Sequence, residues 1–131
     1  MDIAPTLLEV AGVPHPYPRK YKGRPVQPLG GRSMASFIAG KVDAVRDDAE
    51  AIAWESLGWR AVRQGPWKAT WFASPFGPDD WQLFNLDDDL SERNDLSHEN
   101  KAKLDELILL WADYAEEVGV VLPSTMIQWD D

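Results

Sequence analysis

Residues 60–72 read Arg60-Ala61-Val62-Arg63-Gln64-Gly65-Pro66-Trp67-Lys68-Ala69-Thr70-Trp71-Phe72. Two short runs of strand type stand here on either side of Gln64-Gly65. Two such runs joined by a short segment that contains glycine predict a β-hairpin. Pro66 cannot donate a backbone hydrogen bond, so we expect it in the turn or at a bulge.

Runs of the same type flank this hairpin. Ala51-Ile52-Ala53-Trp54 precedes it, and Trp81-Gln82-Leu83-Phe84-Asn85 follows the turn-rich segment 74–80. Parallel strands need long crossover connections, and the connections here are too short for them. The sequence therefore predicts an antiparallel meander of four strands.

A long helix is expected after the sheet, with Ser97 as its N-cap and Gly119 at its end. Apolar residues recur within it at helical spacing: Leu104, Leu107, Ile108, Trp111, Ala115 and Val118. Three more apolar residues widen this stripe and indicate a second partner surface: Leu109, Leu110 and Tyr114. A four-stranded antiparallel sheet packed by one long C-terminal helix belongs to the α+β class.

The chain before the sheet has a different texture. Residues 2–11 predict a short helix with Asp2 as its cap. The segment 13–28 contains five prolines and predicts an extended arm. Ser33 is expected to cap a second short helix that ends at Gly40.

Two parts of the chain are thus predicted, residues 1–49 and residues 50–131. The last residues, which include Ile127 and Trp129, show no periodic pattern. They are expected to form a strap or a tail.

Composition excludes several classes of function. The net charge is −9, from 13 Lys and Arg against 22 Asp and Glu, which disfavours binding to nucleic acid. No apolar run approaches the ~18 residues of a membrane helix, and no basic leader opens the chain. We therefore expect a soluble protein without membrane contact, of the cytoplasm or the periplasm. Because the chain has no cysteine, it has no disulfide, thiolate metal site or cysteine nucleophile.

The chain's histidines and its acidic run are the first candidates for chemistry. His15 and His98 lie far apart and lack partners at ligand spacing, so we interpret both as structural. The acidic run 85–96 resembles the start of a calcium loop, but Leu90 stands where a glycine is needed and Leu96 where a bidentate glutamate is needed. We interpret this run as a solvated turn.

A second group of candidates involves hydroxyl and basic side chains. The run 31–35 around Ser33 lacks the second glycine and the preceding strand of a nucleophile elbow, so Ser33 is interpreted as a helix cap. The basic residues Arg60, Arg63 and Lys68 stand among three tryptophans of the hairpin: Trp59, Trp67 and Trp71. These residues could form a cation–π ligand surface. We favour strand alternation instead, with tryptophan beneath the helix and the basic side chains on the solvated face.

Four segments in order resemble a known family. They are Asp2–Gly12, Gly23–Pro28 with Gly31–Ser33, Arg60–Lys68, and Trp81–Leu96. Together they are similar to the C-terminal part of bacterial arylsulfatases in the alkaline phosphatase superfamily. The resemblance spans almost the whole chain.

The resemblance implies a supporting part, not a catalytic one. In that family a large α/β domain carries the active site, and a small domain of four antiparallel strands and one helix follows. Residues 1–49 would then be the closing helix and wrapping arm of the absent catalytic domain, and residues 50–131 the C-terminal subdomain.

The family's chemistry uses a formylglycine, made from a Cys/Ser-x-Pro-x-Arg motif, beside a divalent cation that is usually calcium. This chain contains no such motif. The resemblance therefore assigns no catalytic, cofactor-binding or metal-binding residue here, and whether the chain is an enzyme stays open.

Three functional hypotheses follow. The first is the C-terminal part of an arylsulfatase, a sulfuric ester hydrolase, that is inactive alone. Its partner would be the absent catalytic domain, or a second copy of this chain bound through exposed apolar surface. The alternative is a stand-alone interaction module that docks a separate catalytic chain. The third is a small enzyme built on His15 or His98.

Overall fold

The fold is taken from a computed structural model, in which residues 1–15, 17, 18 and 20–123 are described. The chain divides into two compact units, Met1–Asp47 and Asp48–Asp131, called unit 1 and unit 2 below. The predicted C-terminal strap or tail with Ile127 and Trp129 lies outside the described residues, as does Pro16 of the predicted arm.

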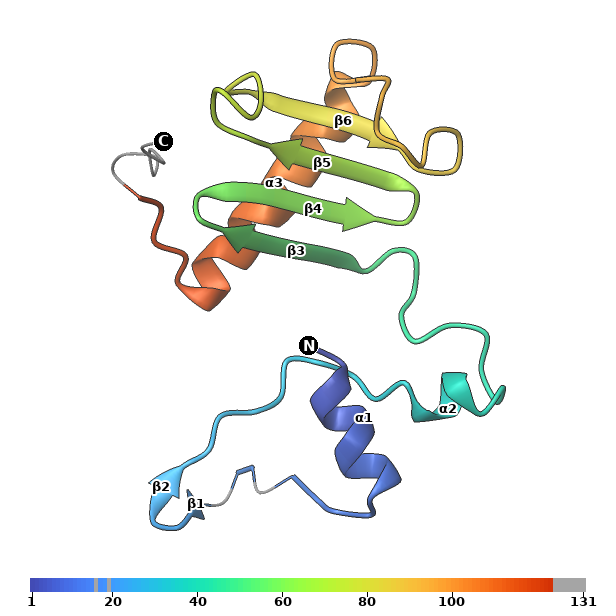
Figure 1. Cartoon of the computed structure of the whole chain (residues 1–131), viewed down its shortest axis with the longest axis vertical. Helices are drawn as coiled ribbons and strands as arrows, with labels where there is room; N and C mark the ends of the chain where they lie inside the picture. The colour runs from blue at the N-terminus through green and yellow to red at the C-terminus, as the bar shows by residue number, and fades with distance from the viewer. Residues whose placement is uncertain (16, 19, 124–131) are drawn as a thin grey trace. The chain divides into compact units, whose positions relative to one another are not determined.

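Unit 2 contains the sheet predicted from the hairpin. Its strands are β3 (Ala51–Ser56), β4 (Trp59–Gln64), β5 (Trp67–Trp71) and β6 (Trp81–Asn85). They lie side by side in the order β3-β4-β5-β6, and every neighbouring pair is antiparallel (Figure 1). The predicted meander is confirmed, including the tight turn at Gly65-Pro66.

One row of small and apolar side chains crosses the whole sheet. Ala53 pairs with Val62, Val62 with Ala69, and Ala69 with Leu83. All four are buried, and they belong to one hydrophobic cluster. Because side chains alternate between the faces of a sheet, this row defines the face on which the core forms.

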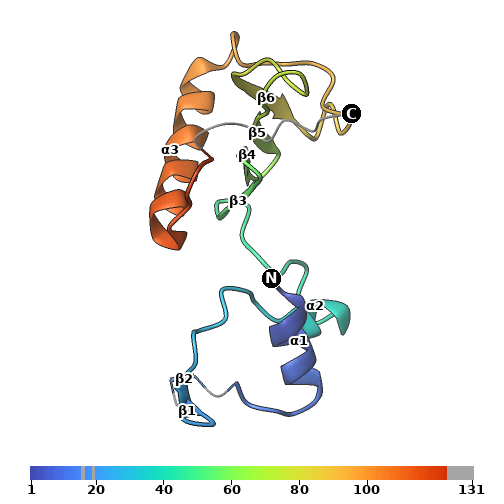
Figure 2. The ribbon, with the colours of Figure 1, turned by 60° about the vertical axis from the view of Figure 1, so that its left-hand side comes forward.

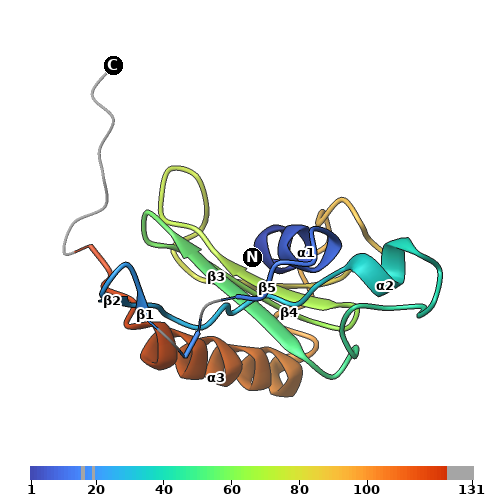
Figure 3. The ribbon, with the colours of Figure 1, turned by 90° about the horizontal axis from the view of Figure 1, so that it is seen from below.

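Helix α3 (Lys101–Val118) covers that face, as Figures 2 and 3 show from two directions. It contributes Leu104, Leu107 and Trp111 to the cluster. The predicted α+β class, a four-stranded antiparallel sheet packed by one long helix, is therefore confirmed.

The predicted start of this helix is wrong. Ser97 lies in a turn, and α3 begins at Lys101 with Asn100 before it. The Leu96 N–H donates to the Leu83 carbonyl oxygen at 2.8 Å, and the Ser97 N–H donates to the Asp95 carboxylate at 2.9 Å. These bonds hold Ser97 beside β6, so the helix starts later. Its predicted end at Gly119 is confirmed, in the left-handed conformation that favours glycine.

The predicted second surface on α3 is also largely wrong. Leu110 and Tyr114 pack against the core cluster, and of the three residues only Leu109 is exposed, at 67%. A twisted sheet is wide enough to cover a broader helical stripe than the sequence reading assumed.

Unit 1 consists of short elements. They are α1 (Ile3–Val10), β1 (Lys20–Tyr21), β2 (Arg24–Pro25) and α2 (Ala35–Ile38). The predicted arm thus contains a small hairpin, in which Tyr21 pairs with Arg24.

Candidate interaction surfaces

The residues singled out for chemistry do not converge. His98 is exposed, and His15 accepts a hydrogen bond from the Tyr17 N–H through Nδ1 at 3.2 Å. The Ser33 hydroxyl oxygen accepts the N–H of Ala35, the first residue of α2, at 3.2 Å. The N-cap residue is Met34, so helix α2 begins one residue later than predicted and Ser33 precedes its N-cap.

The acidic run after β6 bonds to its own backbone. The Asp89 carboxylate accepts the N–H groups of Arg93 and Asn94 at 2.6 and 2.7 Å. The hydrogen bond from Asn94, followed by that from Arg93, lowers the pKa of Asp89 although burial opposes this. The Asn85 side-chain oxygen accepts the Asp87 N–H at 3.2 Å. The side-chain oxygens thus close a turn, which is the interpretation favoured from the sequence.

Within the described ranges, no group of three or more His, Cys, Asp or Glu side chains is placed to hold a metal ion. The helices of this part of the chain are all too short or too polar to cross a membrane.

Arg60 differs from its predicted place. Strand alternation puts it on the helix-covered face, where its guanidinium lies 4.3 Å from the centre of the Trp71 ring and 5.4 Å from that of Trp111. Burial lowers the pKa of Arg60, and the charge of Glu55 partly opposes this. The predicted place on the solvated face is therefore wrong for Arg60, because cation–π contact compensates its burial.

Trp59 also departs from the prediction. It lies on the face opposite α3, where its ring contacts those of Phe72 and Phe76, each with 5.5 Å between ring centres. Lys68 lies on the same face, and its Nζ donates to Glu92 at 2.6 Å. This second face carries partly exposed apolar residues, including Trp54 at 41% and Phe76 at 62%.

Gly77 lets the loop after β5 pass close to Phe72. A Cβ atom at position 77 would lie 2.5 Å from Phe72 Cβ and 2.7 Å from the Phe72 carbonyl oxygen. We expect Gly77→Ala to lower the free energy of unfolding of unit 2 by roughly 1–2 kcal/mol, because the loop must shift to admit the methyl group. Urea unfolding followed by tryptophan fluorescence measures this. An unchanged urea midpoint in Gly77→Ala would contradict the prediction.

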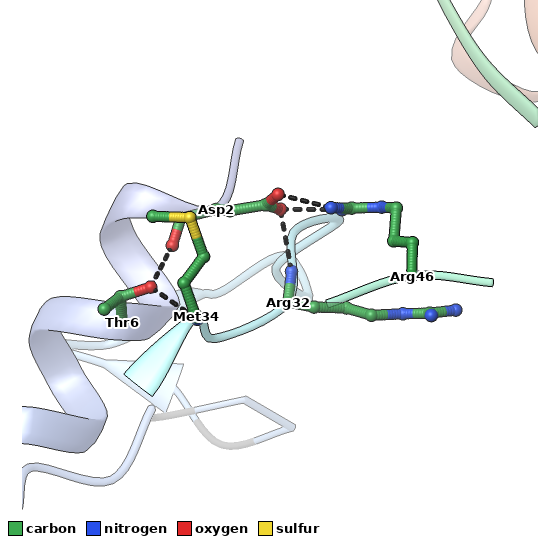
Figure 4. A network of polar contacts seen from close by, with 5 residues as sticks. All are labelled: Asp2, Thr6, Arg32, Met34 and Arg46. Atoms are coloured by element: carbon green, nitrogen blue, oxygen red, sulfur yellow. Dashed lines mark hydrogen bonds and ion pairs between the residues drawn. The ribbon is translucent and has the colours of Figure 1, made fainter. Parts of the chain in front are cut away.

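Unit 1 is held by a polar network around Asp2 (Figure 4). The Asp2 carboxylate binds the Arg46 guanidinium with both oxygens, and Oδ1 also accepts the Arg32 N–H at 2.9 Å. Its backbone oxygen accepts the Thr6 hydroxyl at 2.6 Å, and the Thr6 oxygen in turn accepts the Met34 N–H at 2.9 Å. The predicted capping role of the Asp2 side chain is wrong, because its carboxylate is used in these long-range bonds.

Arg46 determines the ionisation of Asp2. Its guanidinium holds the pKa of the Asp2 carboxyl far below the usual value, and the Arg32 N–H lowers the pKa further, while burial acts in the opposite sense. The carboxylate therefore stays charged at all ordinary pH values. Arg46 lies 44 residues from Asp2, and no motif in the sequence connects them.

Helix α1 carries exposed apolar side chains beside the buried Thr6. Ile3, Leu7 and Val10 are exposed at 68%, 63% and 73%. They are spaced at i, i+4 and i+7, which places them on one helical face. We call these three residues the α1 stripe.

Comparison with known proteins identifies the class to which this arrangement is similar. No family model matches the chain. The chain is 39% identical over 92% of its length to an uncharacterized sulfatase of Schizosaccharomyces pombe, of which it covers 22%. It is 29% identical over 79% of its length to a sulfatase of Formosa agariphila, of which it covers 19%.

A solved structure supports the fold. A Bacteroides thetaiotaomicron protein from work on glycosaminoglycan metabolism matches with a TM-score of 0.64 at 20% identity, over 88% of this chain and 24% of that one. Unit 2 makes up less than two thirds of the chain, so this match includes much of unit 1.

The chain spans about a fifth of the length of the curated relatives it matches. Its similarity is thus to a minor portion of sulfatases.

Proposed function

We propose that this chain is the non-catalytic C-terminal part of a sulfatase of the arylsulfatase type, and that it supports a catalytic domain without hydrolysing sulfate esters itself. The observation that carries this proposal is the 39% identity over nearly all of this chain but only 22% of the fission-yeast sulfatase. In this proposal residues 1–49 are the closing helix and wrapping arm of that catalytic domain, and residues 50–131 are the C-terminal subdomain.

The chemistry of the reaction supports the assignment. Hydrolysis of a sulfate ester needs a strong nucleophile, a cation that takes up charge on the sulfate oxygens, and an acid for the leaving group. The sequence contains neither a cysteine nor a Ser-x-Pro-x-Arg motif from which the family's formylglycine could form. The carboxylates of the acidic turn instead bond to the backbone of the turn itself.

An activity assay tests the catalytic half of this proposal. We expect the isolated chain, incubated with 4-nitrophenyl sulfate and calcium, to release no more product than a heat-killed control. Turnover that is lost in a His15→Ala, His98→Ala double variant would contradict the proposal and favour a small enzyme built on histidine.

A chimera tests the supporting half. This chain replaces the matching portion of the fission-yeast sulfatase, and soluble yield and thermal unfolding are compared with those of the intact relative and of the relative truncated before that portion. We expect the chimera to restore the yield that truncation loses. A truncated protein as stable as the intact one would show that this portion supports nothing.

A second candidate function, a stand-alone module that docks a separate chain, is favoured by the exposed α1 stripe. Light scattering after size exclusion and binding of an apolar dye test this alternative. A monodisperse monomer that binds no dye would count against it.

A further inference from the structure

We infer that the β1–β2 hairpin, residues 20–25, binds neighbouring sulfate groups of a polymeric sulfated glycan and so holds a polymeric substrate. This inference rests on the function proposed above, which places the chain in an enzyme that acts on sulfate esters. It adds a binding site for a ligand larger than a single aryl sulfate to a part of the enzyme that supplies no catalytic residue.

Positive charge is concentrated in one segment of an acidic chain. The chain has 22 Asp and Glu, but none of them lies between Glu9 and Asp43, where six of the 13 Lys and Arg are found. Unit 1 as a whole has seven Lys and Arg against four Asp and Glu, and unit 2 has six against 18. The two units therefore have opposite net charge, so an anionic ligand is attracted by unit 1 and repelled by unit 2.

The β1–β2 hairpin presents three of these cations within five residues. Lys20, Lys22 and Arg24 are all exposed, and none of them makes an ion pair within the described part of the chain. Tyr21 pairs with Arg24 across the hairpin, so their side chains are neighbours. The Tyr21 ring is 58% exposed, and Lys22 Nζ lies 5.4 Å from its centre. The ring offers an apolar surface to a sugar, and the cations beside it can reach charged groups of that sugar.

The turn of this hairpin keeps a cation where the backbone favours other residues. Lys22 and Gly23 are its two central residues, with φ of 49° and 79°. Two-residue turns with positive φ at both positions prefer Asn, Asp or Gly at the first of them. A lysine there is strained, and residues held in such conformations are concentrated at ligand-binding sites. The strain thus indicates that the ammonium group at the tip has a function.

Cations that lie close together favour a ligand with several negative charges. Binding a polyanion relieves their mutual repulsion and releases counterions from the polymer. Repulsion by unit 2 falls off over ~8 Å at physiological ionic strength, so the local cations can still bind. Among polyanions, a sulfated glycan carries the ester that the proposed enzyme hydrolyses. Nucleic acid is the competing ligand.

Binding of dextran sulfate to the whole chain tests the site, with uncharged dextran as the ligand control. The hairpin variant combines three substitutions: Lys20→Gln, Lys22→Gln and Arg24→Gln. All three side chains are exposed, so their replacement leaves the packing of unit 1 intact. Titration calorimetry at several salt concentrations gives the affinity and its dependence on salt.

A matched variant removes the same charge from exposed residues of unit 2. It combines Arg63→Gln, Arg93→Gln and Lys101→Gln. This variant has the same net charge as the hairpin variant, so a difference between the two reports the place of the cations and not their number.

We expect the chain to bind dextran sulfate but not uncharged dextran. At low salt the hairpin variant should lose at least about tenfold in affinity, and the slope of log affinity against log salt should become shallower by roughly one for each contact removed. The matched variant should lose less than about threefold. Equal losses in the two variants, or no binding of dextran sulfate, would overturn the inference and leave the supporting role intact, because the yield of the chimera measures that role separately.

Competition distinguishes the two kinds of polyanion. Single-stranded DNA is added to the complex at the same concentration of negative charge as dextran sulfate. We expect dextran sulfate to stay bound. Displacement by the DNA would show that the hairpin prefers a phosphate backbone and would overturn the assignment to a sulfated glycan.

Discussion

Leu107→Ala is expected to lower the free energy of unfolding of unit 2 by about 2–5 kcal/mol, the range for truncating a fully buried leucine. Leu107 has 0% exposure and lies in the cluster between α3 and the row of Val62, Ala69 and Leu83. The truncation leaves a cavity between α3 and the sheet. The sheet cannot move to close this cavity, because its strands are hydrogen-bonded to one another. The helix loses its central contact with the sheet.

Urea unfolding followed by tryptophan fluorescence measures this loss. All seven tryptophans of the chain lie in unit 2, so the signal does not report on unit 1. Leu109→Ala is the control on the same helix, since Leu109 is 67% exposed and its truncation should change stability by no more than about 0.5 kcal/mol. Equal losses for the two variants would mean that α3 packs through a different face.

The sheet could be predicted from the sequence because its signal is local. Four runs of strand type, separated by short turns, allow only a meander. Alternation along β4 places Val62 on the core face, and the strand register places its partners on the same face: Ala53, Ala69 and Leu83. The same alternation also places Arg60 beneath the helix. The predicted place of Arg60 on the solvated face is wrong, because the Trp71 ring can hold a guanidinium beneath the helix.

Other features depend on contacts that no local pattern records. Ser97 has the chemistry of a helix cap, but the pairing of Leu96 with Leu83 keeps it in a turn. The Asp2–Arg46 pair joins residues far apart in the chain, and a cap was the obvious local role for Asp2. The periodicity of residues 2–11 correctly predicts a helix, observed as α1 (Ile3–Val10).

Unit 1 has fewer buried side chains than unit 2, so its polar network should contribute most of its stability. Asp2→Asn keeps the size of the side chain but removes the charge that binds Arg46. The pair is only 14% and 19% exposed, so its loss should cost more than the ~1 kcal/mol typical of surface pairs. Removing one partner of a fully buried pair lowers stability by about 3–5 kcal/mol. Because this pair is only part-buried, we expect Asp2→Asn to lower the stability of unit 1 by about 2–4 kcal/mol.

Amide hydrogen exchange measures this effect, because the Arg32 and Met34 N–H groups donate into the network. A loss of 2 kcal/mol corresponds to roughly 30-fold faster exchange at these two amides. Exchange at Leu83 in the core of unit 2 serves as the internal control and should not change. Unaltered protection of Arg32 and Met34 in Asp2→Asn would contradict the role given to the network.

The pH dependence of the same measurement follows from the pKa of Asp2. Because Arg46 holds this pKa below its value in the unfolded chain, the carboxylate adds stability above the unfolded pKa, and that stability is lost as pH falls toward the folded pKa. The gap in protection between wild type and Asp2→Asn should therefore be constant from neutral pH to about pH 5 and narrow below about pH 4. A gap that instead narrowed above neutral pH would show that a group other than Asp2 governs the order of unit 1.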